Sequence, residues 1–324
     1  MGTTAIFTSY AKPSVKVVVL MSTWNGERFV AEQLRSILDQ LPDGGRVIVR
    51  DDGSSDQTVA CISELNDPRI TIIKGSNLGF AGSFLTLLQL TPPKVDMVMF
   101  ADQDDVWLPF KINRAWQWLL PYADTAALYC SAQMLVDESL RPQQRTPRWA
   151  QPPSFTGAIA ENMVTGCTAA LNARAVELLK QGGVPSQVRF HDWWLYLVVS
   201  AFGTVLVDDD PTLLYRQHGG NLIGHGAGWW GRHARIVRFL LRTDWVGILL
   251  GQVAELRRCY GDRLSNEQRE LLDRYFNFAA GGNASPRGML ILGRQRWRQT
   301  LPKEILFRAL VLAKSLGIFP RPTR

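Results

Sequence analysis

Residues 97–107 read MVMFADQDDVW, an apolar run that ends in three aspartates within four positions. The run Met97–Ala101 has the length and the unbroken apolar character of a buried β-strand. The carboxylates of Asp102, Asp104 and Asp105 follow directly, and such crowding costs energy unless a cation neutralises it. Hard divalent ions such as Mg²⁺ or Mn²⁺ prefer carboxylate oxygens. Taken alone, the stretch predicts equally well a metal site or an acidic turn that caps a helix beginning near Pro109.

The same order of elements occurs three times before this stretch. Short apolar runs at Val15–Met21, Arg46–Arg50 and Ile70–Lys74 each lead into a polar turn and then into a segment with helical periodicity. Strands that alternate with helices predict an α/β fold with a mostly parallel central sheet flanked by helices. Ligands of such sheets bind beyond the carboxyl ends of the strands, where the polar clusters of this sequence fall.

After Leu120 this rhythm changes. Residues 141–153 are rich in proline and arginine, and they predict an irregular connection. Further on we expect structure over Met163–Asn172, a helix over His191–Phe202, strands over Val205–Val207 and Leu213–Arg216, a glycine-rich loop over 219–231, and amphipathic helices over 235–258 and 266–277.

Charge divides the chain into two parts. The whole sequence has a net charge of +7, but residues 1–224 hold 18 Lys and Arg against 22 Asp and Glu, whereas residues 225–324 hold 18 against 7. We therefore expect an N-terminal extension over 1–14, an α/β domain over 15–224 and a basic helical C-terminal region over 225–324.

Several classes of protein are disfavoured by what the sequence lacks. The four cysteines are widely spaced and include no C-x-x-C pair, which is typical of thiols in a reducing compartment. No apolar stretch approaches the roughly 18 residues of a spanning helix, and residues 1–14 lack a signal-peptide pattern, so we expect a cytoplasmic protein. The first strand is not followed by G-x-G-x-x-G, and no P-loop or nucleic-acid motif is present despite the sequence pI of 9.4.

Four motifs in order carry a family resemblance: TWNGE at 23–27, VRDDGSSD at 49–56, NLGFAG at 77–82 and ADQDDVW at 101–107. This series closely resembles the donor half of family 2 glycosyltransferases with the GT-A fold, and the DQDDVW form resembles the rhamnosyltransferase-like branch. The resemblance covers roughly residues 15–220. It implies a donor half over about 15–120 and an acceptor half over about 121–224.

Carried over to this sequence, the resemblance implies a donor and metal site. Ser22, Asn25 and Asp52 would bind the donor, with Ser22 and Asp52 on its nucleoside. Asp102 would be shared between metal and donor ribose, Asp104 would be the surer ligand of Mg²⁺ or Mn²⁺, and Asp105 has no role in the pattern. His218, in YRQH at 215–218, would complete the metal or pyrophosphate site, although a lone histidine after a strand is more often structural.

The acceptor side rests on HDWW at 191–194, which resembles the family's pair of an acidic residue and an aspartate. The resemblance implies that Asp192 is the catalytic base, with an N-cap as the competing interpretation. His191 departs from the family's acidic residue. Thr165, Gly166 and Trp193 would shape the acceptor pocket.

The function that these implications describe is a metal-dependent inverting transfer of sugar, with L-rhamnose from dTDP-rhamnose as the first choice. The acceptor would be a sugar hydroxyl of a surface polysaccharide or of a polyprenyl-linked oligosaccharide. A UDP-hexose donor stays open, as does a degenerate sugar-nucleotide-binding module that docks to membranes. The basic C-terminal region predicts either a packed helical unit or peripheral contact with an anionic membrane at the inner face of the plasma membrane. The oligomeric state is not indicated.

Overall fold

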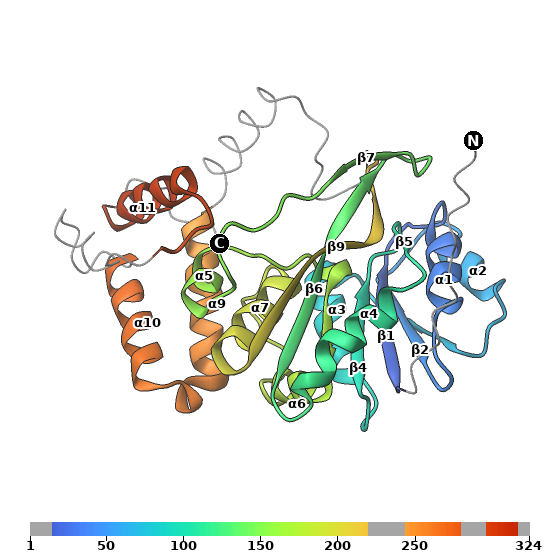
Figure 1. The fold of residues 1–324 in the computed structure, drawn as a ribbon, viewed down its shortest axis with the longest axis horizontal. Helices are drawn as coiled ribbons and strands as arrows, with labels where there is room; N and C mark the ends of the chain where they lie inside the picture. Colours follow the sequence, from blue (N-terminus) through green and yellow to red (C-terminus); the bar gives the residue numbers. More distant parts are fainter. Residues whose placement is uncertain (1–14, 220–243, 280–295, 317–324) are drawn as a thin grey trace.

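The computed structural model describes residues 15–219, 244–279 and 296–316 (Figure 1). Within these residues the strands are β1 (Val17–Thr23), β2 (Arg46–Asp51), β3 (Ile70–Lys74), β4 (Met97–Ala101), β5 (Val106–Trp107), β6 (Ala127–Val136), β7 (Pro142–Arg145), β8 (Ala170–Asn172) and β9 (Thr204–Arg216). They form one sheet in the order β3-β2-β1-β4-β8-β6-β9-β5, with β7 paired to β6.

Helices lie on both faces of this sheet (Figure 1). The helices are α1 (Val30–Leu38), α2 (Thr58–Ser63), α3 (Gly79–Leu90), α4 (Lys111–Leu119), α5 (Phe155–Ala160), α6 (Ala173–Gln181), α7 (His191–Phe202), α9 (Trp245–Tyr260), α10 (Asn266–Ala279) and α11 (Leu301–Ser315). The arrangement is the expected α/β fold with a helical C-terminal region.

The sheet is mixed. Strands β1 to β4 are parallel to one another, as is the pair β6 and β9, whereas β5, β7 and β8 run antiparallel to their neighbours. The expectation of a mostly parallel sheet therefore holds for the first four strands. β6 and β7 are antiparallel because the tight turn between them, in which Leu140 has a φ of 62°, reverses the chain.

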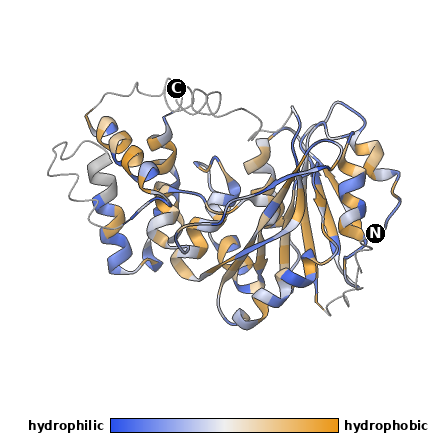
Figure 2. Ribbon diagram, turned by 45° about the horizontal axis from the view of Figure 1, so that its top comes forward, coloured by the Kyte–Doolittle hydropathy of each residue, from blue (hydrophilic) through white to orange (hydrophobic). Residues whose placement is uncertain are grey.

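Alternation along the strands divides the apolar core between the two faces. Val17, Val19 and Met21 of β1 pack with α1 and α4 on one face, whereas Val18 and Leu20 pack with α3 and α7 on the other. Figure 2 shows that the strands of the sheet are largely apolar, whereas the helices beside them carry both apolar and polar stretches. Helices cover both faces of these parallel strands. The four polar loops at the carboxyl ends of the strands therefore form the edge at which a ligand is expected to bind.

The acceptor half differs from the sequence predictions in two places. β9 is one continuous strand through Asp208–Pro211, where two separate strands were expected. A register shift opposite Ser131 and Ala132 absorbs the extra residues, and the side chain of Asp208 pairs with Arg114 and accepts the Tyr129 hydroxyl at 2.8 Å. The connection at 141–153, expected to be irregular, contains the short strand β7.

The C-terminal helices pack on the α/β domain. Val246 and Leu256 of α9 and Phe307 of α11 belong to the same buried cluster as Trp194 of α7. No helix in the described part of the chain is long and apolar enough to cross a membrane. The expected loop over 219–231 and the boundary at 224 fall almost entirely outside the described residues, as do residues 1–14.

Candidate functional site

The loops that follow β1 and β4 are held together at the carboxyl edge of the sheet. Gln103 accepts the Trp24 backbone N–H through Oε1 at 2.9 Å and donates to the Trp24 carbonyl through Nε2 at 3.1 Å. A Cβ added to Gly26 would stand 2.3 Å from Gln103 Oε1, so only glycine lets this amide reach its partners. The TWNGE and ADQDDVW motifs therefore form one surface.

Three of the four residues expected to bind the donor, Ser22, Asn25 and Asp52, lie at this edge and contact other protein groups. Ser22 Oγ lies 2.7 Å from Ser83 Oγ, and Asn25 Oδ1 accepts the Ser55 N–H at 2.8 Å. Asp52 is buried, pairs with Arg50 and accepts the Leu78 N–H at 2.8 Å. The contacts of Asn25 and Asp52 brace the loops, and the donor roles of all three residues remain predictions.

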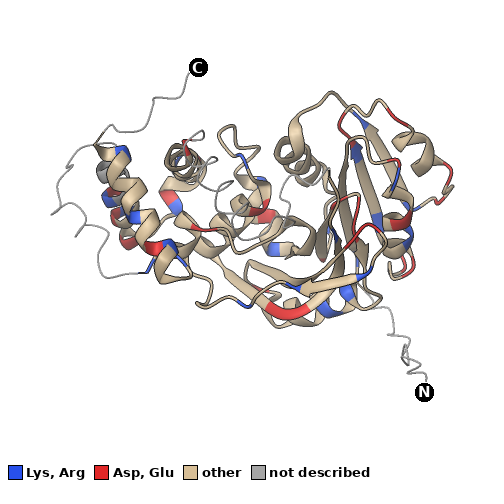
Figure 3. Cartoon of the chain, turned by 90° about the horizontal axis from the view of Figure 1, so that it is seen from above, with Lys and Arg blue, Asp and Glu red and all other residues tan. Residues whose placement is uncertain are grey.

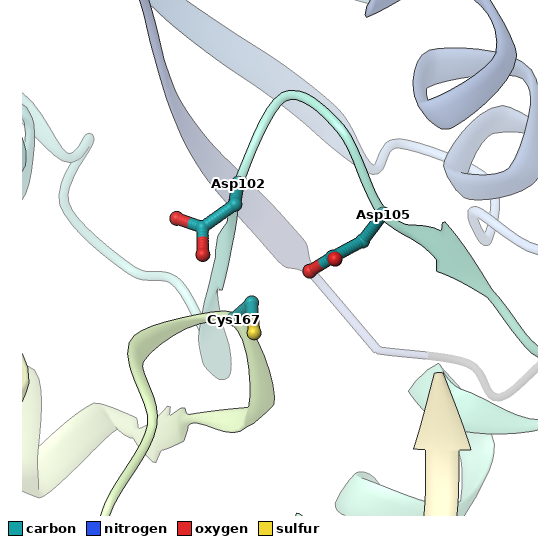
Figure 4. A group of neighbouring side chains, drawn as sticks. All are labelled: Asp102, Asp105 and Cys167. Atoms are coloured by element: carbon teal, nitrogen blue, oxygen red, sulfur yellow. The ribbon is translucent and has the colours of Figure 1, made fainter. Parts of the chain in front are cut away.

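The acidic loop after β4 has its side chains in two groups. Asp104 Oδ2 lies 2.7 Å from His218 Nε2, so the expected pair of metal ligands meets across the site. Asp102 and Asp105 approach Cys167 of the turn Gly166–Thr168, and one ligand atom of each lies within 4.8 Å of the others (Figure 4). Figure 4 shows Asp102 and Asp105 on the two arms of one loop, with Cys167 on a second loop below and between them.

Burial makes this carboxylate group unfavourable when it is charged. Burial and then the charge of Asp104 raise the pKa of Asp102, to about 7, and raise that of Asp105 well above its ordinary value. Asp105 Oδ2 has no hydrogen-bond partner among the described residues. These are the conditions that a bound divalent cation relieves, and the aspartate oxygens with His218 are suitable ligands. Burial also raises the pKa of the Cys167 thiol, so the neutral sulfur is a poor ligand for a hard ion.

Arg216, at the end of β9, connects that strand to the acidic loop. Its backbone N–H donates to Asp105 Oδ1 at 3.3 Å, its Nε donates to the Asp104 carbonyl at 2.8 Å, and its Nη2 lies 2.6 Å from Glu32 Oε2. Sequence reasoning missed Arg216 and gave no role to Asp105. The signal for Arg216 was its place two residues before His218. The hydrogen bonds of Arg216 to Asp104 and Asp105 hold this end of β9 against the acidic loop.

Asp192 lies in the first turn of α7, near enough to Asp102 for its charge to act on that carboxyl. Its Oδ1 accepts the Trp193 N–H at 2.7 Å. Burial raises the pKa of Asp192 to about 6, although hydrogen bonds from Trp193, the Asn162 side chain and Gly166 lower it. The charge of Asp192 also contributes to the raised pKa of Asp102. A carboxyl with a pKa close to neutral, beside the acidic loop, suits a general base.

His191, which replaces an acidic residue of the family pattern, is a neutral core residue. Its ring stacks on Phe84 with centroids 4.2 Å apart and lies 5.8 Å from the ring of Phe100. Burial lowers the pKa of His191 to about 3, and neither ring nitrogen has a hydrogen-bond partner among the described residues. The departure from the family pattern therefore removes a charge beside Asp192.

The three expected acceptor residues differ in their exposure. Thr165 is exposed, whereas Gly166 is buried with His191 Nε2 only 2.5 Å from where its Cβ would be. Trp193 is 2% exposed, donates its indole N–H to the Ala158 carbonyl at 2.6 Å and packs on Trp245. Trp193 therefore has the surroundings of a core residue, which do not support an acceptor contact, whereas Thr165 and Gly166 lie at the turn that faces the acidic loop.

A cavity of about 740 Å³ lies away from these residues. Lys16, Lys94 and Lys180 line it together with Asp96 and Glu177, at the amino ends of β1 and β4. The candidate site residues instead gather at the opposite, carboxyl ends of these strands, as expected for this class of sheet.

Comparison with known proteins agrees with this architecture. Residues 18–178 match the family model Glycosyl transferase family 2. The chain is 28% identical over 237 residues to the dTDP-rhamnosyl transferase RfbG of Shigella flexneri. This match covers 69% of this chain and 80% of that protein. It is 30% identical over 98 residues, 30% of this chain and 38% of the relative, to the UDP-Glc:alpha-D-GlcNAc-diphosphoundecaprenol beta-1,3-glucosyltransferase WfgD of Escherichia coli.

Among solved structures, residues 1–349 of S. aureus TarS in complex with UDP-GlcNAc superimpose with a TM-score of 0.60 at 14% identity. The match covers 93% of this chain and 89% of that chain. At this identity the likeness concerns the fold, and it includes the C-terminal helices as well as the sheet.

Proposed function

This chain belongs to glycosyltransferase family 2, and on that premise we propose that it transfers L-rhamnose from dTDP-rhamnose to a sugar hydroxyl, with a divalent cation and with inversion at the anomeric carbon. The observation that carries the proposal is the meeting of the Asp104 and His218 pair, Asp102 and Asp192 at the carboxyl edge of a GT-A sheet. The similarity to RfbG over most of the chain supports the choice of donor.

Asp102, Asp104 and His218 would hold Mg²⁺ or Mn²⁺. The ion would supply Lewis-acid stabilisation of the departing nucleoside diphosphate. Two features of the chain suit this role: Asp104 is already in contact with an imidazole, and Arg216 fixes the backbone carbonyl of Asp104. We further propose that Ser22, Asn25 and Asp52 border the donor on the side of β1 and β2.

Asp192 would take the proton of the acceptor hydroxyl as its oxygen attacks the anomeric carbon from the face opposite the leaving group. A single displacement of this kind inverts the anomeric configuration and needs no covalent intermediate on the enzyme. The raised pKa of Asp192 makes the carboxylate a stronger base than an ordinary aspartate, and Thr165 and Gly166 would line the path of the acceptor.

A UDP-hexose is the second candidate donor, since the chain is also similar to WfgD, whose name specifies UDP-Glc. That name specifies an acceptor on diphosphoundecaprenol, and we propose by analogy a saccharide acceptor that is lipid-linked or part of a surface polysaccharide. Incubation with dTDP-rhamnose, UDP-glucose, UDP-GlcNAc and GDP-mannose, with release of nucleoside diphosphate as the readout, tests the donor. We expect the fastest release from dTDP-rhamnose. Faster release from a UDP-hexose would reverse the assignment.

We propose that the catalytic unit spans residues 15–224 and that residues 225–324 also contact an anionic membrane surface at the cytoplasmic face. The outer side of α11 supports this contact because Leu301 and Ile305 are each 61% exposed and Leu316 is 52% exposed. Figure 3 shows basic and acidic residues together on the C-terminal helices, and Lys314 pairs with Asp244 while Arg308 pairs with Glu304. Contact would therefore rely on apolar insertion as well as on charge.

A further inference from the structure

The loop that precedes the turn at Gly166 is held by residues from the far end of the chain. Arg298 Nη1 donates to the Ala160 carbonyl, Gln299 N–H donates to Glu161 Oε2 at 2.7 Å, and Gln299 Nε2 lies 3.3 Å from Met163 Sδ. We call Arg298, Gln299 and Lys303 the C-terminal brace, and residues 160–166 the braced segment.

Glu161 is the centre of these contacts. Its residue is 7% exposed, its Oε1 lies 2.7 Å from Lys303 Nζ, and its Oε2 lies 3.3 Å from Arg298 Nε. A carboxylate with so little solvent depends on these two cations and on the Gln299 N–H for its stability. Glu161 can therefore keep its buried position only while the brace is in place.

The brace is itself fixed by the start of α11. Glu304 Oε2 accepts the backbone N–H groups of Trp297 and Arg298 at 2.9 and 2.8 Å, and Trp297 is 2% exposed against Phe307. Gln299 Oε1 also accepts the Gln151 N–H at 2.8 Å, which adds the connection after β7 to the same assembly. The brace therefore has a defined conformation that it imposes on the braced segment.

On its other side, the braced segment reaches Asp192. Asn162, the next residue after Glu161, uses Oδ1 to accept the Val164 N–H at 3.0 Å, which leaves its amide nitrogen for Asp192. The Asn162 side chain and the Gly166 backbone both lower the pKa of the Asp192 carboxyl through hydrogen bonding, and the Cβ position of Gly166 lies 3.7 Å from Asp192 Cβ. The ion-paired carboxylate and the amide side chain beside Asp192 thus belong to consecutive residues.

We propose that Glu161 is a positioning residue for the transfer reaction, through which the C-terminal brace fixes Asn162 and thereby the orientation of the Asp192 carboxyl. The inference rests on the proposed role of Asp192 as base. It makes the C-terminal helices part of the support for catalysis, although residues 18–178 alone match the family model. A purely structural role for the same contacts would affect stability and leave the kinetic constants unchanged.

The test compares full-length Glu161→Gln and Asn162→Ala with wild type and with the control Asp208→Asn. Asp208 is matched to Glu161 because it is 3% exposed, pairs with an arginine and accepts the Asp210 N–H at 3.0 Å, but its contacts do not reach the braced segment. Release of dTDP from dTDP-rhamnose, with water as acceptor, gives kcat and the donor KM. Glu161→Gln retains an oxygen that accepts the Gln299 N–H, so it tests the ion pairs with the least change of shape.

We expect Glu161→Gln and Asn162→Ala each to lower kcat by about 10- to 100-fold with little change in donor KM, because a small misplacement of a catalytic group has effects of this order. The double variant should be no slower than the slower single variant, because both changes act through one contact. Asp208→Asn should unfold at a lower temperature and retain the wild-type kcat. A Glu161→Gln enzyme whose kcat equals that of Asp208→Asn would overturn the inference.

A second readout separates failure of this inference from failure of the proposed function. Hydrogen–deuterium exchange of peptides covering 158–168 needs no substrate. Even if wild type releases no nucleoside diphosphate from any donor, which would remove the proposed function, Glu161→Gln should raise exchange in this peptide and leave β1 and β4 unchanged. Unchanged exchange over 158–168 would show that Glu161 does not hold the segment, and would overturn the inference whatever the activity.

Discussion

His218 Nε2 lies 2.7 Å from Asp104 Oδ2, although 114 residues separate them in the sequence. The contact forms because β5 pairs with the end of β9 directly after the acidic loop. Arg216 strengthens it by donating to the Asp104 carbonyl. The end of β9 and the loop after β4 therefore act as one unit in our account of the metal site.

Replacement of His218 by alanine tests this unit. Mn²⁺ with dTDP should raise the melting temperature of wild type, since a ligand at 100 times its Kd stabilises a protein by about 2.7 kcal/mol. His218→Ala should lose much of that gain, about 1.4 kcal/mol for each tenfold loss of affinity. Differential scanning fluorimetry with and without EDTA measures it. An equal, metal-dependent gain in His218→Ala would exclude the histidine from the site.

Asp192→Asn should separate stability from activity. The pKa of Asp192 is about 6 in the folded protein and about 4 in the unfolded chain. Ionisation of this buried carboxyl therefore lowers the stability of the folded protein, by its full amount above pH 6. The cost disappears as the pH falls from 6 towards 4, because the carboxyl becomes protonated in both states. The uncharged variant should therefore be more stable than wild type at pH 8 by up to about 3 kcal/mol, and no more stable at pH 4. Thermal unfolding at the two pH values measures the difference.

The same residue should dominate the acid limb of the rate profile. Wild-type kcat/KM should fall as the pH drops through about 6, because the base must be deprotonated, and Asp192→Asn should be slower by about 10²- to 10⁴-fold at pH 8 with similar donor affinity. A variant that loses donor binding as severely as turnover would place Asp192 in the donor site instead.

Gly166→Ala should damage the site through sterics alone. The added Cβ would stand 2.5 Å from His191 Nε2, and the imidazole cannot move away because Phe84 and Phe100 pack against it. The turn must shift, and with it the Gly166 backbone, whose Cβ position lies 3.7 Å from Asp192 Cβ. We expect a loss of about 1–3 kcal/mol in stability and a lower kcat. Wild-type values of both in Gly166→Ala would mean that the turn adjusts without cost.

Membrane contact predicts that the protein co-sediments with phosphatidylglycerol vesicles, less with neutral ones, and that binding weakens as salt is raised. Leu301→Glu with Ile305→Glu should reduce binding, because both side chains are 61% exposed on α11. Leu120→Glu is the matched control, since that residue is 54% exposed elsewhere. Equal recovery of wild type in the supernatant with both lipids at low salt would leave the region with a packing role only.

Much of the α/β fold was predictable from the sequence because its signals are local. The strand over 97–101 and the helix over 191–202 have the predicted bounds, since an acidic cluster follows the apolar run of the strand and Gly203 follows the apolar run of the helix. β9 was predicted as two pieces because Asp208–Pro211 has the composition of a turn. The strand tolerates the buried charge of Asp208 because this carboxylate pairs with Arg114 and accepts the Tyr129 hydroxyl, and both residues are distant in sequence.

The site was less predictable where it depends on long-range partners. The contact of Asp104 with His218 follows from the motif order, but the role of Asp105 depends on Arg216, and the position of Glu161 depends on Gln299, 138 residues away. Trp193 was assigned to the acceptor pocket as an aromatic residue beside Asp192, and its acceptor role stays a prediction that the burial of its indole against Ala158 and Trp245 does not support. A sequence motif shows neither the distant contact partners of its residues nor whether their side chains are buried.

The most direct test of the central claim is release of dTDP from dTDP-rhamnose by wild type and by Asp104→Asn, each with Mn²⁺ and with EDTA. Asparagine keeps the size of the Asp104 side chain and removes the negative charge that we propose binds the metal. We expect release by wild type with Mn²⁺ and loss of release in EDTA and in Asp104→Asn, with the variant still folded by circular dichroism. Near-normal release by Asp104→Asn in EDTA would contradict the metal-dependent mechanism.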